Sequence, residues 1–343
     1  MYKSVIRPLF FTLKPETIHH LVDSGMRALF SVPGIPGITG HFADVRDERL
    51  SREVFGLRFK NPVGVAAGFD KQARMYNDLA HLGFGFVEIG TITPRPQPGN
   101  PTPRLFRLKQ DNALINRMGF NNIGVDAAVE NLKKRNTDII IGGNIGKNTA
   151  TPNDKAIDDY VICFEKLFDH VDYFVVNVSC PNITNLGELQ DQDKLMAILN
   201  RLQAVNHESS HPKPILLKVS PDLNNKQLDE VIEIVGLTGI DGVVATNTTI
   251  TRNNLTTPDD TVKQIGNGGL SGRPIKNRST EVIRYLAEKS GKAFPIIGVG
   301  GIFTPEDAIE KLEAGADLVQ VYTGFIYEGP FIARKINKAL LKR

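Results

Sequence analysis

A cysteine between two asparagines is the clearest candidate for a reactive site in this sequence. The segment Asn177-Val-Ser-Cys-Pro-Asn182 follows the apolar run Tyr173–Val176, which predicts a buried parallel strand. The proline after the cysteine cannot continue a strand, so Cys180 is expected where the strand becomes a loop. Because asparagine both donates and accepts hydrogen bonds, Asn177 and Asn182 could hold a planar, oxygen-rich ligand around the sulfur. The alternative is a structural cysteine in an asparagine-rich turn.

Similar chemistry-bearing segments follow the other apolar runs of the chain. These segments are Ala66–Lys71, Gly90–Arg95, Asn144–Asn148, Lys218, Thr246–Thr249, Gly298–Ile302 and Tyr322–Gly324. Lys71 could bind an anion, and Lys218 would end an apolar strand where a lone ammonium needs an anionic partner. The glycine-rich turn Gly298–Ile302, together with Tyr322–Gly324, predicts a phosphate site built from backbone N–H groups.

A fold that gathers eight strand ends is needed to bring these segments together. The expected strands are Pro62–Val65, Phe86–Ile89, Ile139–Gly143, Tyr173–Val178, Ile215–Val219, Gly242–Ala245, Pro295–Val299 and Leu318–Val321. Helical stretches separate them, and eight β/α units in order predict an α/β protein with a closed (β/α)8 TIM barrel rather than an open sheet. In such a barrel the active site lies at the carboxyl ends of the strands.

Three further segments are expected to frame the barrel. Leu50–Phe59 predicts a hairpin that turns at Gly56 and closes the bottom of the barrel. A second hairpin is predicted from Arg104–Leu108 and Ala113–Arg117, within an insertion between the second and third barrel strands. The polar, glycine-rich segment Asn253–Gly269 is typical of a mobile active-site loop.

Residues 1–40 are expected to form a helical unit ahead of a catalytic barrel domain of residues 41–343. After Pro15, apolar residues recur at helical spacing: Ile18, Leu21, Val22, Met26, Leu29 and Phe30. A shorter apolar patch, Val5–Phe11, precedes them, and the prolines and glycines of segment 33–37 are expected to end the unit as a linker. Two interpretations are open: a helix pair packed on the barrel, or a two-helix device that dips into a membrane surface.

The composition narrows the class of protein. The chain has 343 residues, 41% hydrophobic and 23% charged, which is typical of a soluble globular protein. A net charge of +3 is too small to indicate a nucleic-acid partner. Cys163 and Cys180 do not make a disulfide framework, which fits a reducing compartment, and Cys163 lies in a helical pattern that places it in the core. We expect no metal site, no secretory or transit signal and no membrane-spanning segment.

Together these motifs resemble the dihydroorotate dehydrogenase family, flavoproteins of pyrimidine biosynthesis, over nearly the whole chain. The resemblance extends to the motifs Asn116–Asn122 and Gly269–Pro274, and the N-terminal unit is similar to that of the membrane-associated, quinone-reducing class. It implies oxidation of dihydroorotate to orotate in UMP synthesis, with FMN as cofactor and a membrane quinone as electron acceptor. It also implies a peripheral position on the cytoplasmic face of a bacterial cell membrane, with the N-terminal helices on the membrane surface.

The resemblance also implies a role for individual residues. FMN would be contacted by Ala67, Gly68, Thr91, Asn144, Asn177, Lys218, Thr246, Gly272, Gly301, Tyr322 and Thr323. The substrate would be surrounded by Lys71, Asn116, Arg117, Met118, Gly119, Phe120, Asn177, Asn182, Asn247 and Thr248. Cys180 would be the catalytic base that takes a proton from substrate C5 while hydride passes from C6 to the flavin. Lys218 would stabilise negative charge on the reduced flavin, and Lys71 would neutralise the substrate carboxylate.

One residue departs from the class that the N-terminal unit indicates. Quinone-reducing members usually carry serine as the base, whereas cysteine, as at Cys180, is typical of the soluble class that uses fumarate or a nicotinamide partner. We give the helical unit more weight, because a Ser/Cys exchange preserves the proton-transfer role. The alternatives are a soluble fumarate- or NAD-linked dihydroorotate dehydrogenase and, from another class, a non-catalytic barrel that binds a phosphorylated ligand.

Overall fold

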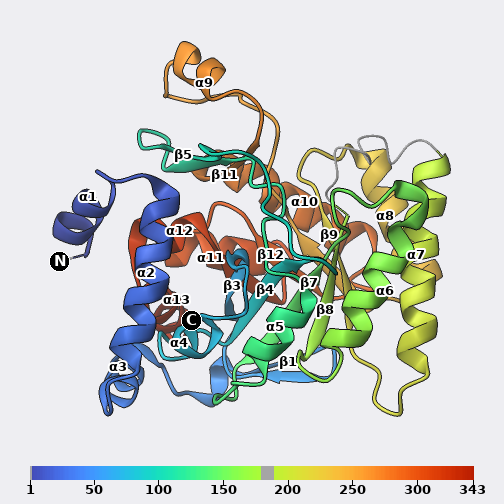
Figure 1. The fold of residues 1–343 in the computed structure, drawn as a ribbon, viewed down its shortest axis with the longest axis horizontal. Coiled ribbons are helices and arrows are strands. Elements are labelled where there is room, and N and C mark those ends of the chain that lie inside the picture. Colours follow the sequence, from blue (N-terminus) through green and yellow to red (C-terminus); the bar gives the residue numbers. More distant parts are fainter. Residues whose placement is uncertain (1, 179–188) are drawn as a thin grey trace.

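Eight parallel strands form a closed barrel surrounded by helices (Figure 1). This computed structural model describes residues 2–178 and 189–343. In chain order the barrel strands are β3 (Val63–Asp70), β4 (Phe86–Ile92), β7 (Ile140–Ile145), β8 (Tyr173–Asn177), β9 (Ile215–Val219), β10 (Gly242–Ala245), β12 (Ile296–Val299) and β13 (Leu318–Val321). Each strand pairs with the next, and β13 pairs with β3 to close the ring. The predicted (β/α)8 fold is confirmed.

Helices cover the outside of this barrel and share one large apolar core with the outward-facing strand residues. They are α4 (Tyr76–Ala80), α5 (Val125–Leu132), α6 (Ala156–Leu167), α7 (Leu189–His207), α8 (Asn225–Thr238), α10 (Lys276–Lys289), α11 (Pro305–Glu313), α12 (Thr323–Glu328) and α13 (Ile332–Leu340). Every predicted barrel strand is therefore followed by at least one helix, as the alternation in the sequence indicates.

The first three barrel strands extend further toward their carboxyl ends than predicted. β3 continues through Asp70, so most of the segment Ala66–Lys71 belongs to the strand and not to the loop after it. In the same way Thr91 lies inside β4 and Asn144 inside β7. Small and polar side chains do not end these strands, because pairing with a neighbouring strand continues: Asp70 of β3 pairs with Ile89 of β4, and Ile92 of β4 pairs with Ile145 of β7.

The predicted hairpin β1 (Arg52–Val54) and β2 (Leu57–Phe59) closes one end of the barrel. Its turn residues Phe55 and Gly56 have positive φ angles of 54° and 71°, as a tight two-residue hairpin turn requires. The fully buried ring of Phe59 contacts the ring of Phe86 with centroids 5.3 Å apart, and Phe55 stacks at 6.4 Å on Tyr173. The aromatic side chains of this hairpin therefore pack against residues that point into the barrel.

A three-stranded antiparallel sheet stands apart from the barrel, next to the short helix α9 (Asp259–Ile265) (Figure 1). The predicted second hairpin is present as β5 (Leu105–Leu108) and β6 (Ala113–Asn116). Its third strand, β11 (Gly269–Gly272), was not predicted, because two glycines in four residues give little intrinsic preference for a strand. The edge of β6 supplies the partner that this segment needs.

The N-terminal unit contains a helix where the sequence predicted a linker. Its elements are η1 (Tyr2–Ile6), α1 (Arg7–Phe10), α2 (Pro15–Phe30) and α3 (Ile35–Ala43). The linker prediction is wrong because Pro36 and Gly37 lie inside α3. Proline is tolerated in a first helical turn, where its missing N–H would have had no helical partner. Gly34 precedes the helix with a left-handed φ of 89°, and α3 continues to Ala43, past the predicted boundary at residue 40.

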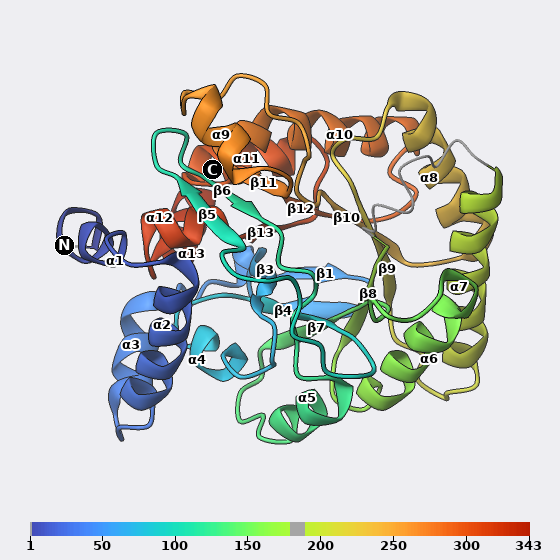
Figure 2. The ribbon, with the colours of Figure 1, turned by 45° about the horizontal axis from the view of Figure 1, so that its top comes forward.

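The apolar stripe of α2 divides between the core and the surface. Ile18 and Phe30 are buried, whereas Leu21 and Leu29 are 54% and 52% exposed. Figure 2 shows α2 and α3 side by side at the outer edge of the molecule. We call the exposed large apolar side chains of the N-terminal unit the apolar face; they are Val5, Leu9, Leu13, Leu21, Leu29, Val32, Ile38 and Phe42. Within the described part of the chain, none of the helices has the length and apolarity needed to span a bilayer.

Candidate active site

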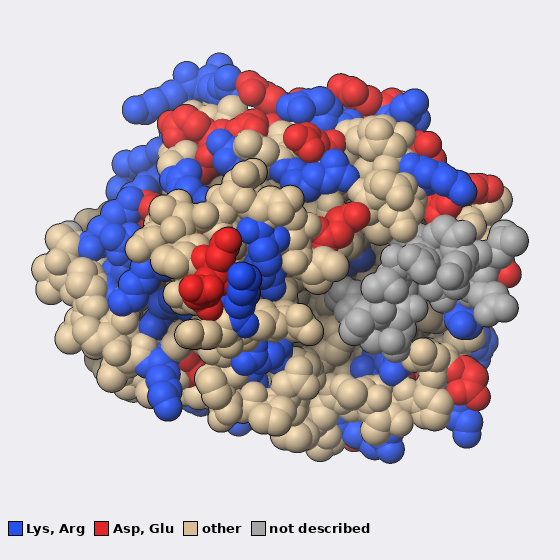
Figure 3. Space-filling view, turned by 90° about the horizontal axis from the view of Figure 1, so that it is seen from above, with Lys and Arg blue, Asp and Glu red and all other residues tan. Residues whose placement is uncertain are grey.

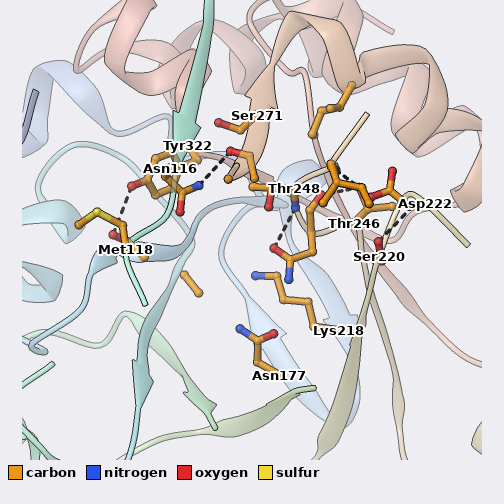
Figure 4. A pocket seen from close by; sticks show the side chains of 18 of the residues that line it. Asn116, Met118, Asn177, Lys218, Ser220, Asp222, Thr246, Thr248, Ser271 and Tyr322 are labelled. Carbon is orange, nitrogen blue, oxygen red and sulfur yellow. Dashed lines mark hydrogen bonds between the residues drawn. The ribbon is translucent and has the colours of Figure 1, made fainter. Parts of the chain in front are cut away.

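A cavity of about 1520 Å³ opens at the carboxyl ends of the barrel strands. Basic and acidic side chains are intermixed on this face of the molecule (Figure 3). Residues of β3, β4, β8, β9, β12 and β13, and of the loops that follow the strands, line it. Figure 4 shows Asn177 and Lys218 pointing into the cavity from the neighbouring strands β8 and β9. This cavity therefore lies at the carboxyl ends of the strands, where the sequence predicts the site.

The residues that the resemblance assigns to FMN share this cavity, with one exception. Lining it are Ala67, Gly68, Thr91, Asn177, Lys218, Thr246, Gly272, Gly301, Tyr322 and Thr323. Asn144 is fully buried behind the wall, where its Oδ1 accepts from Thr91 Oγ1 at 2.6 Å and from Asn177 Nδ2 at 3.3 Å. In the structure its side chain therefore orients two residues of the wall.

The substrate residues also line the cavity wherever the structure describes them. These are Lys71, Asn116, Arg117, Met118, Gly119, Phe120, Asn177, Asn247 and Thr248. Cys180 and Asn182 lie outside the described residues, so the predicted catalytic base and its second flanking amide stay predictions. The chain reaches the cavity just before them, because Asn177 and Val178 are part of the wall.

A carboxylate that the sequence analysis missed lies at the centre of the barrel. Glu88 of β4 is fully buried and accepts from Lys218 Nζ at 3.1 Å, from Asn144 Nδ2 at 2.7 Å and from Gln320 Nε2 at 2.7 Å. Its partners come from β9, β7 and β13, so one side chain joins four strands. A charge inside the apolar run Phe86–Ile89 was the available signal, because a buried charge requires a partner. Glu88 is the anionic partner that Lys218 was expected to need.

Lys71 is held in a partly buried position between the barrel and the N-terminal unit. Its ammonium donates to Asn121 Oδ1 at 2.7 Å. Burial and, to a smaller extent, the nearby Arg104 lower the pKa of Lys71 to about 7, and Glu16 of α2 acts in the opposite direction. Glu16 and Arg104 are themselves paired at 2.6 Å with side chains 20% and 12% exposed. Helix α2 is therefore part of the electrostatic surroundings of the substrate side of the cavity.

Arg117 makes hydrogen bonds and a ring contact that the sequence did not predict. Its guanidinium donates to the backbone carbonyls of Ile265 and Asn267 and lies 4.6 Å from the ring centroid of Phe106. At the other end of the same sheet, the carboxylate of Asp111 accepts from the backbone N–H groups of the segment 256–257. These contacts fasten the segment Asn253–Gly269, which was expected to be a mobile loop, to the β5–β6 hairpin. Its mobility stays a prediction.

The glycine turn predicted to hold a phosphate lines the opposite end of the cavity. Gly301 has a φ of 72°, and a Cβ built on it would lie 2.5 Å from Lys276 Cα. Only a residue without a side chain allows the turn to pack this closely against Lys276. Gly300 and Gly324, which belong to the two segments predicted to form the phosphate site, also line this end, and so does Ser271, for which the sequence predicted no ligand contact.

Comparisons with known proteins agree with this architecture. The family model described as dihydroorotate dehydrogenase matches residues 49–343. A protein of Christiangramia forsetii named dihydroorotate dehydrogenase (quinone) is 60% identical over 343 residues, covering 100% of this chain and 99% of that protein. One of the same name from Roseiflexus sp. is 46% identical and covers 99% of this chain and 93% of its own. A crystal structure of DHODH from Eimeria tenella in complex with ferulenol superposes with a TM-score of 0.84 at 36% identity, covering 96% of this chain and 91% of that one.

We predict that replacing the buried carboxylate of Glu88 by an amide strongly destabilises the protein. Glu88→Gln leaves the Lys218 ammonium buried without a carboxylate, which should lower the free energy of unfolding by about 3–5 kcal/mol. Urea unfolding measures this loss, and Glu88→Gln/Lys218→Met should recover part of it. Glu130→Gln, which disrupts the exposed pair with Lys133, is the matched control and should change little. If Glu88→Gln and Glu130→Gln unfold at the same urea concentration, the Glu88 network does not have this effect on stability.

Proposed function

The chain belongs to the dihydroorotate dehydrogenase family, and we propose that it oxidises dihydroorotate to orotate with FMN as cofactor and a membrane quinone as electron acceptor. The observation that carries this proposal is the full-length match to relatives named for the quinone-dependent enzyme, which includes the N-terminal helices. The soluble fumarate- or NAD-linked alternative is not favoured, because Cys180 alone supports it. A non-catalytic barrel does not account for the buried Glu88–Lys218 pair, whose lysine lines the cavity.

A flavin follows from the family, and the proposal of FMN rests on the fit of the cavity. Two ligands side by side could occupy a cavity of about 1520 Å³, since single small-molecule sites usually enclose about 300–1000 Å³. The turn at Gly300 and Gly301, with Thr323 and Gly324, offers backbone N–H groups to one phosphate. Lys218 and Asn177 would hold the ring system at the barrel axis. When bound, FMN supplies the redox chemistry that the side chains lack.

The remaining steps belong to the chain's own residues. We assign binding of the substrate carboxylate to Lys71, and its orientation to the amides of Asn116, Asn177 and Asn247, which line the cavity. Cys180 would remove the proton from C5. A free thiol has a pKa of about 8.5, far closer to neutrality than a hydroxyl, so cysteine can act as the base with less assistance than serine.

The domain assignment is a helical access unit followed by the catalytic barrel. We propose that the apolar face of the N-terminal unit lies in the interface of the cell membrane on its cytoplasmic side, as a peripheral attachment. Contacting aromatic rings connect this unit with the cavity wall, since His19 lies 5.4 Å from Phe69, and Phe69 lies 5.9 Å from Tyr322. We propose that a lipophilic quinone would approach the cavity along these rings. Burial, with Lys71 and His20 nearby, lowers the pKa of His19 to about 4, so this ring is neutral at pH 7.

Removal of the proposed base tests the reaction. Cys180→Ala should retain bound flavin but lose its reduction by dihydroorotate, because only proton abstraction is removed. Stopped-flow absorbance under anaerobic conditions measures the bleaching of the flavin. Cys163→Ala is the matched control, since Cys163 is fully buried in α6 and burial raises the pKa of its thiol. Normal bleaching in Cys180→Ala would refute the assignment.

The assignment of Lys71 predicts a pH dependence for ligand binding. Because its lowered pKa is about 7, Lys71 is charged below that pH and progressively neutral above it. The affinity for the orotate anion should be constant below about pH 7 and weaken as the pH rises, by up to about tenfold per pH unit. Lys71→Met should bind orotate weakly with a flat profile. Titration of the flavin spectrum with orotate at several pH values measures the affinity of the parent protein and of Lys71→Met. Equal pH profiles for these two proteins would contradict the assignment.

The apolar face predicts a separation of the two half-reactions. Leu21→Asp/Phe42→Asp should leave flavin reduction by dihydroorotate unchanged, because both side chains are more than half exposed and distant in sequence from the strand ends. Binding to lipid vesicles and reoxidation by a long-chain quinone should both fall. Leu237→Asp on α8, where Leu237 is 62% exposed, introduces the same kind of charge elsewhere and should change neither. Unaltered vesicle binding in the double variant would contradict the proposed attachment.

A further inference from the structure

A lysine that the proposed function does not use is buried behind the glycine turn of the cavity. Lys311 of α11 has no exposed surface, which is rare for a lysine. Its ammonium donates to the backbone oxygen of Lys276 at 2.8 Å and to Thr280 Oγ1 at 2.6 Å. Within the described ranges 2–178 and 189–343, no carboxylate lies within 4.0 Å of this nitrogen. The two nearest acids of its own helix, Asp307 and Glu310, pair with Lys276 instead.

The residues that Lys311 holds are the ones that support the turn. Both of its acceptors belong to the first turns of α10, against which the glycines pack. A Cβ on Gly301 would lie 2.5 Å from Lys276 Cα, and one on Gly300 would lie 2.9 Å from Ser279 Cβ. Ser279 also donates to the backbone oxygen of Val299 at 2.7 Å. A displacement of this part of α10 would therefore displace the cavity wall.

The same turn is held from its other end by α11. Asp307 accepts from the backbone N–H groups of Phe303 and Thr304, each at 2.9 Å, and from Lys276 Nζ at 2.7 Å. Burial alone would raise the pKa of Asp307, but these hydrogen bonds hold it below its usual value. The turn is thus fixed between α10 and α11, and Lys311 is the buried link between the two helices.

Lys311 also brings a charge to a part of the cavity whose wall is neutral. Gly272, Gly300, Gly301, Thr323 and Gly324 line this end, and none carries a charge. A phosphate monoester carries about −1.5 to −2 charges at pH 7. Burial lowers the pKa of Lys311 to about 7, with Glu310 acting in the opposite direction, which is the behaviour of an ammonium short of anionic partners. An anion bound at the turn would supply such a partner from the other side of the glycines.

We propose that Lys311 is a positioning residue for the cofactor phosphate: it fixes the first turns of α10 behind Gly300 and Gly301 and supplies a buried positive charge behind their N–H groups. This inference rests on the proposed function, because FMN carries a phosphate. Lys311 does not touch the ligand. Its effect is confined to the phosphate end of the cavity, and the ring system is held by other residues.

The test compares FMN with riboflavin, which has the same ring system and no phosphate. Release of flavin from the purified flavin-loaded protein is followed by fluorescence on dilution, with FMN and after exchange into riboflavin. Lys311→Met should weaken FMN binding by roughly tenfold or more and leave riboflavin binding nearly unchanged, because only the charge on the phosphate side is lost. Lys338→Met, an exposed lysine of α13, removes the same charge from the surface and should keep the FMN preference.

A second variant keeps the test decisive if Lys311→Met fails to fold. Lys311→Gln retains a hydrogen-bond donor without the charge and should lose the same preference. Equal weakening of FMN and riboflavin would show that Lys311 is merely structural, and an unchanged FMN preference in the folded variants would also overturn the inference. If the parent protein itself bound riboflavin as tightly as FMN, the cofactor assignment would fail, and this inference with it.

Discussion

The buried carboxylate of Glu88 is the contact on which the geometry of the site depends. It joins four strands of the barrel through Lys218, Asn144 and Gln320. Because Asn144 in turn accepts from Thr91 and Asn177, the same network orients three polar groups of the cavity wall. A buried ion pair adds little net stability over apolar packing, but either partner alone would be costly. The network is therefore better explained by the positioning of Lys218 than by stability.

Each end of the cavity is supported from behind by residues that no ligand would touch. The glycine turn is held between α10 and α11 by Lys276, Asp307 and Lys311. On the substrate side, the Glu16–Arg104 pair connects α2 with the insertion that carries the β5–β6 hairpin, close enough to influence the pKa of Lys71. The N-terminal unit thus has an electrostatic connection to the site as well as an exposed apolar face, which fits a role in delivering an acceptor to it.

The sequence predicted the barrel and most of the cavity wall because these depend on local patterns: apolar runs, the residues that follow them, and glycine turns. It failed where tertiary contacts decide the outcome. β11 is a strand only because the edge of β6 pairs with it, and α3 forms across a proline and a glycine that suggested a linker. The Glu88–Lys218 pair joins residues far apart in the chain, so the isolated charge in a strand was visible but its partner was not. Cys180 was predicted from its position after a strand, and it lies outside the described residues.

The proposed function joins a cysteine base, typical of the soluble class, to a quinone as electron acceptor. The most direct test is to reduce the flavin-loaded protein with dihydroorotate under anaerobic conditions and then to offer quinone in vesicles, fumarate or NAD⁺ separately. Flavin absorbance should return rapidly with quinone and not with the other two acceptors. Rapid return with fumarate or NAD⁺, and none with quinone, would contradict the proposed function and place the protein in the soluble class that Cys180 suggests.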